Sequence, residues 1–322
     1  MIRFLVALFF LFLLSFSAVA SDACDREVPD DLYELKENHI PVEYPPDPFA
    51  LEVTDLAVLI LLMGLAAGFS LKHKRIAWLT LLMVVGLSYF GFFRGGCICP
   101  VGATTNFFIG LAAPELIGKV VAVLFLLPLI FAFFFGRVFC SSACPLGAVQ
   151  HLLARKKGIR LPARLNAVVR LLPVGMLLAT IWGALRGGYF LACKLDVYKL
   201  LFFTGYAWID QILLWIKGAL VETQILWVGD VMAWFTLLAV LVVGFFVSRP
   251  FCRFVCPYSV LLGLASVLGL RRRRIDVEAC VNCRLCEKHC PVQAIDGTRI
   301  SDFHCIQCGR CDDSCRKDAL SR

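Results

Sequence analysis

Five long apolar segments constrain the fold of this chain more than any other feature of its sequence. They cover about residues 54–71, 76–93, 118–135, 168–185 and 224–247. A bilayer core of about 30 Å needs roughly 20 apolar residues of helix, and a helix satisfies its own backbone hydrogen bonds. With 60% hydrophobic and 17% charged residues, the chain also departs from the composition of soluble domains. The sequence therefore predicts an all-α polytopic membrane domain with about five transmembrane helices, within residues 51–270.

The amino terminus has the pattern of a signal peptide. Arg3 precedes an apolar core that ends in the small-residue sequence "AVA". Residues 1–20 are therefore expected to be a signal peptide cleaved after Ala20, or alternatively an uncleaved first transmembrane helix. In both cases the following residues emerge outside the cytoplasm. Residues 21–50 are acidic and rich in proline, which predicts an extended periplasmic segment.

Basic clusters indicate how the spans are oriented. They lie at 72–75, 155–157 and 271–274, and all three fall on the cytoplasmic side when the spans are threaded from an external amino terminus. The apolar segment 200–216 contains Asp210. If this segment crossed the membrane, the basic cluster at 271–274 would lie on the outer side, so we expect an interfacial or re-entrant helix there. The expected location is the bacterial cytoplasmic (inner) membrane, with a periplasmic mature amino terminus and a cytoplasmic carboxyl terminus.

The carboxy-terminal residues 271–322 contain two successive C-x2-C-x2-C-x3-C runs. These runs are typical of an α+β bacterial ferredoxin with two [4Fe-4S] clusters, in which the fourth cysteine of each run reaches the other cluster. The predicted ligands of cluster 1 are Cys280, Cys283, Cys286 and Cys315. The predicted ligands of cluster 2 are Cys305, Cys308, Cys311 and Cys290. A zinc site is the alternative, but zinc ribbons pair two C-x2-C knuckles across a long gap.

The membrane part contains an internal repeat. The sequence "GRVFCSSACPLG" aligns with "SRPFCRFVCPYS", so that an arginine, a phenylalanine, two cysteines and a proline recur at the same offsets. The matched residues are Arg137, Phe139, Cys140, Cys144 and Pro145 in the first copy and Arg249, Phe251, Cys252, Cys256 and Pro257 in the second. A pseudo-twofold axis normal to the membrane would bring the four cysteines to one side, where they either converge or form two separate pairs.

We interpret these four thiols as a redox-active or metal-linked set at the cytoplasmic rim, and call them the rim cysteines: Cys140, Cys144, Cys252 and Cys256. The C-x3-C spacing predicts that each pair spans one helical turn with both sulfurs on one face. The alternative is that they are packed or free thiols beside a helix-starting proline. On the external side, disulfides compete with paired redox thiols or metal ligands as explanations of Cys97, Cys99 and Cys193.

Other cofactors and partners are not expected. The five histidines lie outside the predicted spans, no C-x-x-C-H occurs and no glycine-rich nucleotide motif is present, so haem, NAD and ATP are not predicted. The net charge of +8 comes from cations beside apolar runs, which favours membrane lipid over nucleic acid as a partner. Asp196, Tyr198 and Lys199 fit a solvated loop better than a quinol pocket.

Paired C-x3-CP motifs followed by a two-cluster ferredoxin resemble the NapH/NosR/CcoG-type membrane polyferredoxins, over about residues 76–318. The resemblance implies that the chain moves electrons between a quinol or cytoplasmic donor and a periplasmic or membrane-bound reductase or oxidase. It implies two [4Fe-4S] clusters on the carboxy-terminal cysteines, and an additional metal or cluster at the rim cysteines is a further expectation. The external "GCICPVG" loop suggests a variant subfamily.

Three functions follow as expectations. The first is an electron-transfer protein between cytoplasmic [4Fe-4S] clusters and the outer face of the membrane, rather than a stand-alone enzyme. The alternative is an assembly or maturation factor that reduces a metal ion for an exported or membrane metalloenzyme. A third is a redox sensor that signals without turnover.

Overall fold

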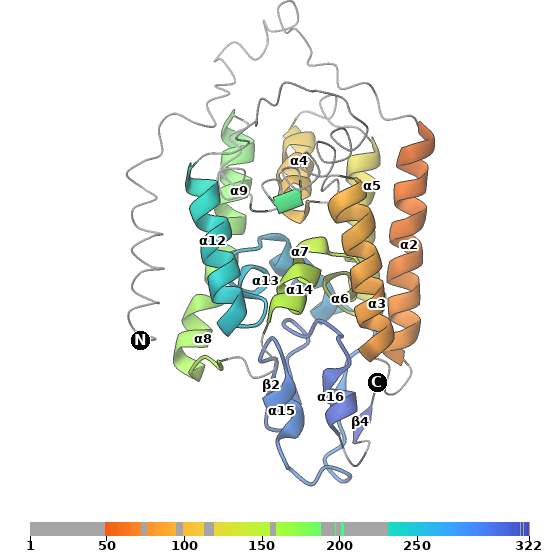
Figure 1. The fold of residues 1–322 in the computed structure, drawn as a ribbon, viewed down its shortest axis with the longest axis vertical. Helices are drawn as coiled ribbons and strands as arrows, with labels where there is room; N and C mark the ends of the chain where they lie inside the picture. The colour runs from red at the N-terminus through yellow and green to blue at the C-terminus, as the bar shows by residue number, and fades with distance from the viewer. Residues whose placement is uncertain are drawn as a thin grey trace, which may run out of the picture. The chain divides into compact units, whose positions relative to one another are not determined.

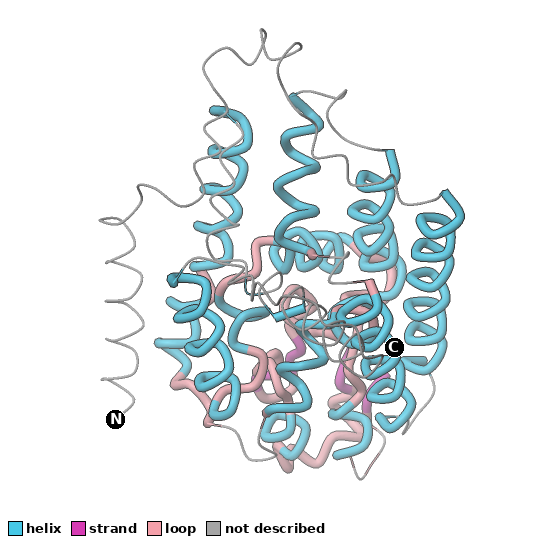
Figure 2. Tube along the Cα trace, turned by 45° about the horizontal axis from the view of Figure 1, so that its top comes forward, coloured by secondary structure: helices cyan, strands magenta, loops and turns pink. Residues whose placement is uncertain are grey.

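The fold described by the computed structural model is mostly helical, with a small α+β part at the carboxyl end (Figures 1 and 2). The structure describes residues 49–71, 76–94, 99–112, 119–154, 159–187, 197, 201–202, 231–315, 317 and 319–321. The predicted signal segment 1–20, residues 21–48 and the segment 203–216 lie outside these residues.

Helices occupy all five apolar segments that the sequence singles out. They are α2 (Phe49–Leu71), α3 (Ile76–Gly86) with the π-helix η1 (Leu87–Phe93), α5 (Lys119–Phe135), α8 (Ala163–Val169) with α9 (Leu172–Gly187), and α12 (Val231–Phe246). Pro173, near the start of α9, lacks a backbone N–H, which is compatible with the interruption between α8 and α9. Two stretches within the described residues, Ile76–Phe93 and Ala163–Leu185, are long and apolar enough to cross a membrane. The other apolar stretches described are shorter.

Shorter helices connect these elements and fill the centre of the bundle. They are α4 (Pro100–Ala112), α6 (Phe139–Ser142), α7 (Pro145–Leu153), α13 (Pro250–Phe254) and α14 (Tyr258–Leu268). The packing of α14 on α5 is fixed by Tyr258, whose hydroxyl donates to the carbonyl oxygen of Phe125 at 2.6 Å. The Phe125 ring in turn stacks on Phe107 of α4, with ring centres 4.2 Å apart. Aromatic packing therefore ties the last helix of the bundle to its middle.

Each C-x3-C pair spans the turn at which a short helix ends, so the helix does not continue past the second cysteine. Cys140 lies in α6, whereas Cys144 has an extended backbone with ψ of 111° and precedes α7. Cys252 lies in α13, and Cys256 falls between α13 and α14. The cause is the proline that follows the second cysteine of each pair, because its ring disfavours a helical conformation at the preceding residue.

The two segments nevertheless end their short helices in the same way. The carbonyl oxygen of Phe139 accepts hydrogen bonds from the N–H groups of both Ala143 and Cys144, each at 3.1 Å. In the second segment, the carbonyl oxygen of Phe251 accepts hydrogen bonds from the N–H groups of the equivalent residues, Val255 and Cys256, each at 2.9 Å. We refer to residues 137–145 and 249–257 as the first and second C-x3-CP segments. Their matching sequences thus produce matching backbone turns.

The carboxy-terminal part is α+β, as its cysteine runs predict. Strand β1 (Arg274–Ile275) pairs antiparallel with β4 (Leu320–Ser321), and β2 (Ile295–Asp296) pairs antiparallel with β3 (Arg299–Ile300). Helices α15 (Leu285–His289) and α16 (Arg310–Ser314) pack against each other. Ile275, Ile295 and Leu320 form a small apolar core together with Cys311. A core this small leaves the cysteine loops as the main tertiary constraint of this part.

Candidate iron–sulfur and thiol sites

The two cysteine loops share one backbone conformation. In the first loop Asn282 and Arg284 flank Cys283 with φ of 50° and 54°. In the second loop Gln307 and Gly309 flank Cys308 with φ of 54° and 74°. Left-handed residues are uncommon outside glycine. Alternating right- and left-handed backbone turns N–H groups inward, which suits an anionic ligand. Both loops therefore have the backbone of an anion-binding site with three thiols around it.

The cluster 1 cysteines surround one cavity. A cavity of about 290 Å³ is lined by Cys280, Cys283, Cys286 and Cys315, with Ile275 and Leu320 on its apolar side. Cys286 interacts electrostatically with the other three thiols. The fourth cysteine of the second run thus lies beside the first three of the first run, which is the grouping expected from the crossing of the two runs.

The cluster 2 cysteines form a second, more deeply buried group. Cys290, Cys305, Cys308 and Cys311 line one cavity, and the Sγ of Cys290 accepts a hydrogen bond from the N–H of Ala294 at 3.2 Å. Burial raises the pKa of Cys290 and Cys305 to about 11, and that of Cys311 to about 12. Buried thiols with these pKa values become thiolates at neutral pH only where positive charge, such as iron, is bound.

An ion pair lies beside the cluster 2 cysteines. The Nη1 of Arg273 is 3.2 Å from the Sγ of Cys311 and 2.9 Å from the Oδ2 of Asp312. Burial lowers the pKa of Arg273, but the negative charges of Cys311 and Asp312 outweigh burial and raise it. The guanidinium stays charged, and the carboxylate of Asp312 offsets that charge.

The spacing of the thiols suits clusters better than single ions. Among the residues that the structure describes, no three His, Cys, Asp or Glu side chains gather closely enough to hold one metal ion. Four thiolates on one zinc ion would lie about 3.8 Å apart, since each Zn–S bond is about 2.3 Å. A [4Fe-4S] core spreads its four ligand sulfurs over separate irons. The cavities between the thiols fit this second arrangement.

The rim cysteines converge rather than forming two separate pairs. Cys144 interacts electrostatically with Cys252, Cys140 and Cys256, and Cys256 interacts with Cys252 and Cys140. Three of the four side chains are buried, and Cys252 is partly buried. The two C-x3-CP segments, 112 residues apart in the chain (from 137 to 249), therefore contribute to one group of thiols.

The rim cysteines lie against the cluster 2 side of the carboxy-terminal part. Cys252 lines a small cavity with Val292, Phe303 and Ile306. Val292 and Ile306 belong to the same buried core as the other three rim cysteines, and Cys290, Cys305 and Cys308 pack against that core. The cluster 1 cysteines Cys280, Cys286 and Cys315 pack instead around the small core of the α+β part. The three groups therefore follow in the order cluster 1, cluster 2, rim.

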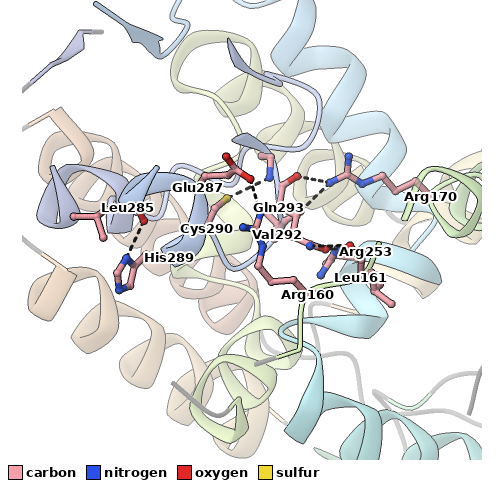
Figure 3. A network of polar contacts seen from close by, with 11 residues as sticks. Arg160, Leu161, Arg170, Arg253, Leu285, Glu287, His289, Cys290, Val292 and Gln293 are labelled. Atoms are coloured by element: carbon pink, nitrogen blue, oxygen red, sulfur yellow. Dashed lines mark hydrogen bonds and ion pairs between the residues drawn. The ribbon is translucent and has the colours of Figure 1, made fainter. Parts of the chain in front are cut away.

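A polar network that the sequence did not reveal joins the helices to the α+β part (Figure 3). The Nη2 of Arg170 donates to the carbonyl oxygens of Val292 at 2.9 Å and Gln293 at 2.8 Å. The Nη2 of Arg253 donates to the side-chain oxygens of Gln293 at 2.6 Å and Asn166 at 2.7 Å. One feature of the sequence could have indicated this network: Arg253 in the second segment aligns with Ser141 in the first, so only the second segment has a basic side chain at this position.

Of the cysteines that the sequence predicts to be external, only Cys99 lies among the described residues. Cys99 is buried just before α4, and its Sγ accepts a hydrogen bond from the N–H of Gly102 at 3.3 Å. Cys97 and Cys193 lie outside the described residues, as do Asp196, Tyr198 and Lys199.

Comparison with known proteins identifies the domains. A family described as a 4Fe-4S binding domain matches twice, at residues 117–162 and 230–276, and a second 4Fe-4S binding domain family matches residues 273–296. The chain is 32% identical over 77 residues to the putative electron transport protein YccM of Escherichia coli, covering 23% of this chain and 22% of YccM. It is 42% identical over 79 residues to protein NirI of Paracoccus denitrificans, covering 23% of this chain and 11% of NirI.

The chain contains 4Fe-4S binding domains and is similar to membrane polyferredoxins of the NapH/NosR/CcoG type. The expected resemblance is confirmed, although the chain spans less than half of the length of each of these curated relatives. An uncharacterized protein of Methanocaldococcus jannaschii is 34% identical over 123 residues, covering 38% of this chain and 48% of that protein. No solved structure matches the chain.

The positions of the matches agree with the geometry of the thiol groups. Each match to the first family contains one C-x3-CP segment, and neither reaches the eight carboxy-terminal cysteines. The match to the second family covers the first cysteine run. Similarity to 4Fe-4S binding domains therefore extends over the regions that contain the rim cysteines as well as over the first ferredoxin run.

Proposed function

We propose that this chain is a multi-pass protein of the bacterial cytoplasmic membrane that passes single electrons between cytoplasmic [4Fe-4S] clusters and the membrane or its periplasmic face. It would serve a periplasmic or membrane-bound reductase or oxidase, with a quinol or a cytoplasmic protein as the other partner. The observation that carries the proposal is the series of three thiol groups, cluster 1, cluster 2 and rim, in which each group packs against the next.

The chain supplies the ligands and their spacing. The cluster 1 and cluster 2 cysteines each line a cavity, and each set provides the four thiolates that a [4Fe-4S] cluster needs. When bound, such clusters supply one-electron chemistry. The part of the protein is to hold the thiol groups in series, bury the second and third groups from water, and fix the α+β part on the helices through Arg170 and Arg253.

A membrane location is supported by the outward faces of the helices. Leu178 and Trp182 of α9 are 62% and 64% exposed, and Leu61 of α2 is 59% exposed. Contiguous apolar side chains on the outside of a helical bundle are costly in water and favourable in lipid. We retain five spans, two related halves and a signal segment at 1–20 as parts of the proposal, with 21–50 periplasmic, 51–270 in the membrane and 271–322 cytoplasmic.

The orientation of the two halves also supports the proposal. Arg137 follows α5 and Arg253 follows α12, and both donate hydrogen bonds to the α+β part. The ends of these two helices are therefore on the same side as the ferredoxin cysteines. That side would be the cytoplasm, where the basic clusters are retained and thiols stay reduced.

Iron analysis tests the proposal. Protein purified without oxygen should contain about eight irons per chain from the two ferredoxin clusters, and should absorb broadly at roughly 400 nm through thiolate-to-iron charge transfer. Fewer than about two irons per chain would overturn it.

The convergence of the rim cysteines also favours a second candidate, a maturation factor that reduces and delivers a metal ion. Thiolate groups select soft ions such as Cu(I). Deletion of the gene separates the two functions. A partner enzyme that is fully metallated but lacks electrons supports electron transfer, whereas a partner that lacks its metal supports maturation.

A further inference from the structure

Two arginines are buried beside the rim cysteines, one from each C-x3-CP segment. Arg137 is 5% exposed and Arg249 is 0% exposed, which makes Arg249 the largest fully buried side chain among the described residues. They occupy equivalent positions in the aligned sequences. In the part of the chain that the structure describes, neither Arg137 nor Arg249 forms an ion pair with a carboxylate. The arginines that do so are Arg94, Arg160, Arg272, Arg273 and Arg274.

Their hydrogen bonds leave the positive charge uncompensated. Arg249 donates to the carbonyl oxygen of Cys140 and to the Sδ of Met83 at 3.6 Å. Arg137 donates to the carbonyl oxygen of Phe303 at 2.8 Å. The Nε of each arginine is buried without a partner. Arginine does not lose its proton in proteins, and a buried charge is unfavourable unless an opposite charge lies nearby. The site therefore lacks an anion.

The rim cysteines are the groups placed to provide that anion. The Nη2 of Arg137 lies 3.8 Å from the Sγ of Cys140, and both arginines act electrostatically on Cys252. Four neutral thiols, or two disulfides, carry no charge. Four thiolates on a [4Fe-4S] core of charge +2 carry a net charge of 2 − 4 = −2, which matches two guanidinium groups.

We propose that Arg137 and Arg249 are built-in countercharges of an iron–sulfur centre ligated by Cys140, Cys144, Cys252 and Cys256. This inference rests on the proposed electron-transfer function and extends it to a third centre. The arginines stabilise the reduced form of the centre more than the oxidised form, because the reduced form carries one more negative charge. They therefore raise its reduction potential.

Arg170 provides a matched control. Like Arg249 it donates to backbone carbonyl oxygens, those of Val292 and Gln293. Its electrostatic partner among the cysteines is Cys290 of cluster 2, and not a rim cysteine. If the fully buried Arg249 and the half-buried Arg170 had only a structural role, their replacement would affect the centres alike. A role as countercharge makes each arginine affect a different centre.

The test is a redox titration followed by electron paramagnetic resonance on the full-length protein, purified in detergent without oxygen. The wild-type protein should contain about twelve irons per chain, four for each of three clusters. Arg249→Met should lower the potential of one centre, or remove about four irons, and leave the other two centres unchanged. Arg249→Lys should restore the third centre. Arg170→Met should leave that centre at its wild-type potential.

If Arg249→Met does not fold, Arg137→Gln removes the equivalent charge while its amide can still donate to Phe303, and it should also lower the potential of the third centre. A wild-type protein with about eight irons and two normal ferredoxin signals would overturn this inference and leave the proposed function standing. Loss of those two signals would instead count against the proposed function. Unchanged potentials and iron in both arginine variants would overturn the inference as well.

Discussion

Arg249 of the second C-x3-CP segment donates a hydrogen bond to the backbone carbonyl oxygen of Cys140 in the first. The bond crosses from one segment to the other and fixes the position of a thiol that belongs to the partner segment. Charged hydrogen bonds in buried surroundings are stronger than neutral ones. The relative placement of the rim cysteines is thus determined by the protein itself.

Replacing either Cys140 or Cys252 with serine should impair electron transfer and leave both ferredoxin clusters in place. The reason is that the rim cysteines lie beyond cluster 2, whereas the eight carboxy-terminal cysteines have their own cavities. The measurement is electron flow from a chemical reductant to an acceptor across vesicles that contain the protein, with cluster signals recorded in parallel. Normal flow in both variants would show that these thiols are structural.

Gly136→Ala should destabilise the contact between the helices and the second cysteine loop. Gly136 has φ of 77°, and an added Cβ would lie 2.8 Å from the Nε2 of Gln307. The left-handed backbone alone costs an alanine roughly 1–2 kcal/mol. Gly297 has φ of 57° and nothing within 4 Å of an added Cβ, so Gly297→Ala isolates the backbone cost. Thermal unfolding should show the larger loss for Gly136→Ala, and equal losses would contradict the packing argument.

Arg253→Ser should loosen the α+β part from the helices without removing its clusters. The serine reproduces the residue at the aligned position, Ser141, and leaves the side chain of Gln293 without its charged donor. Hydrogen bonds to charged groups contribute about 1.5–3 kcal/mol. Hydrogen exchange should increase at Gln293 and its neighbours. The exposed pair of Arg160 and Glu287, at 3.3 Å, gives the comparison, because Arg160→Ser should cost about 0–1 kcal/mol.

Acid should weaken the contact between α7 and α16 through His151. The Nη2 of Arg310 lies 3.2 Å from the Nε2 of His151, so that nitrogen accepts the bond and the ring is neutral. Burial, followed by the charges of Arg249 and Arg310, lowers the pKa of His151 from 6.5 to about 3. Between these values the unfolded chain binds a proton that the folded protein does not, so stability falls as pH falls from about 6.5 to 3.

His151→Gln checks this origin of the pH dependence. The glutamine oxygen can accept the bond from Arg310 but does not titrate. Melting temperatures of the variant should fall less than those of the wild-type protein between pH 6.5 and 4, and the difference between the two should be constant above pH 7.5. Parallel curves over the whole range would show that His151 does not contribute.

The sequence predicted the cysteine sets because their chemistry is local. The spacing of three thiols in seven residues determines a tight loop, and the paired left-handed residues around Cys283 and Cys308 follow from it. The helices were predicted for a similar reason, since unbroken apolar runs allow little else. The spacing also predicted that each C-x3-C pair spans one turn, and Pro145 and Pro257 end the short helix at that turn.

The parts that sequence could not supply depend on contacts between distant residues. Whether the rim cysteines converge depends on how α5 and α12 pack, and no local pattern encodes that. Arg170 and Arg253 lie near the ends of apolar segments, where a basic residue is equally well explained as one that flanks a membrane span. Their partners, Val292 and Gln293, are about 120 and 40 residues away in the chain, so their role emerges only once the chain is folded.

The difference between Ser141 and Arg253 has a consequence for how the molecule assembles. If the two C-x3-CP segments were identical, the α+β part could attach to either of them equally well. The protein would then populate two arrangements. Arg253 on the second segment, together with Arg170 at the end of α8 and Arg137 on the first segment, distinguishes the two arrangements. The matching segments supply the four thiols, and the residues in which the two halves differ determine where the α+β part attaches.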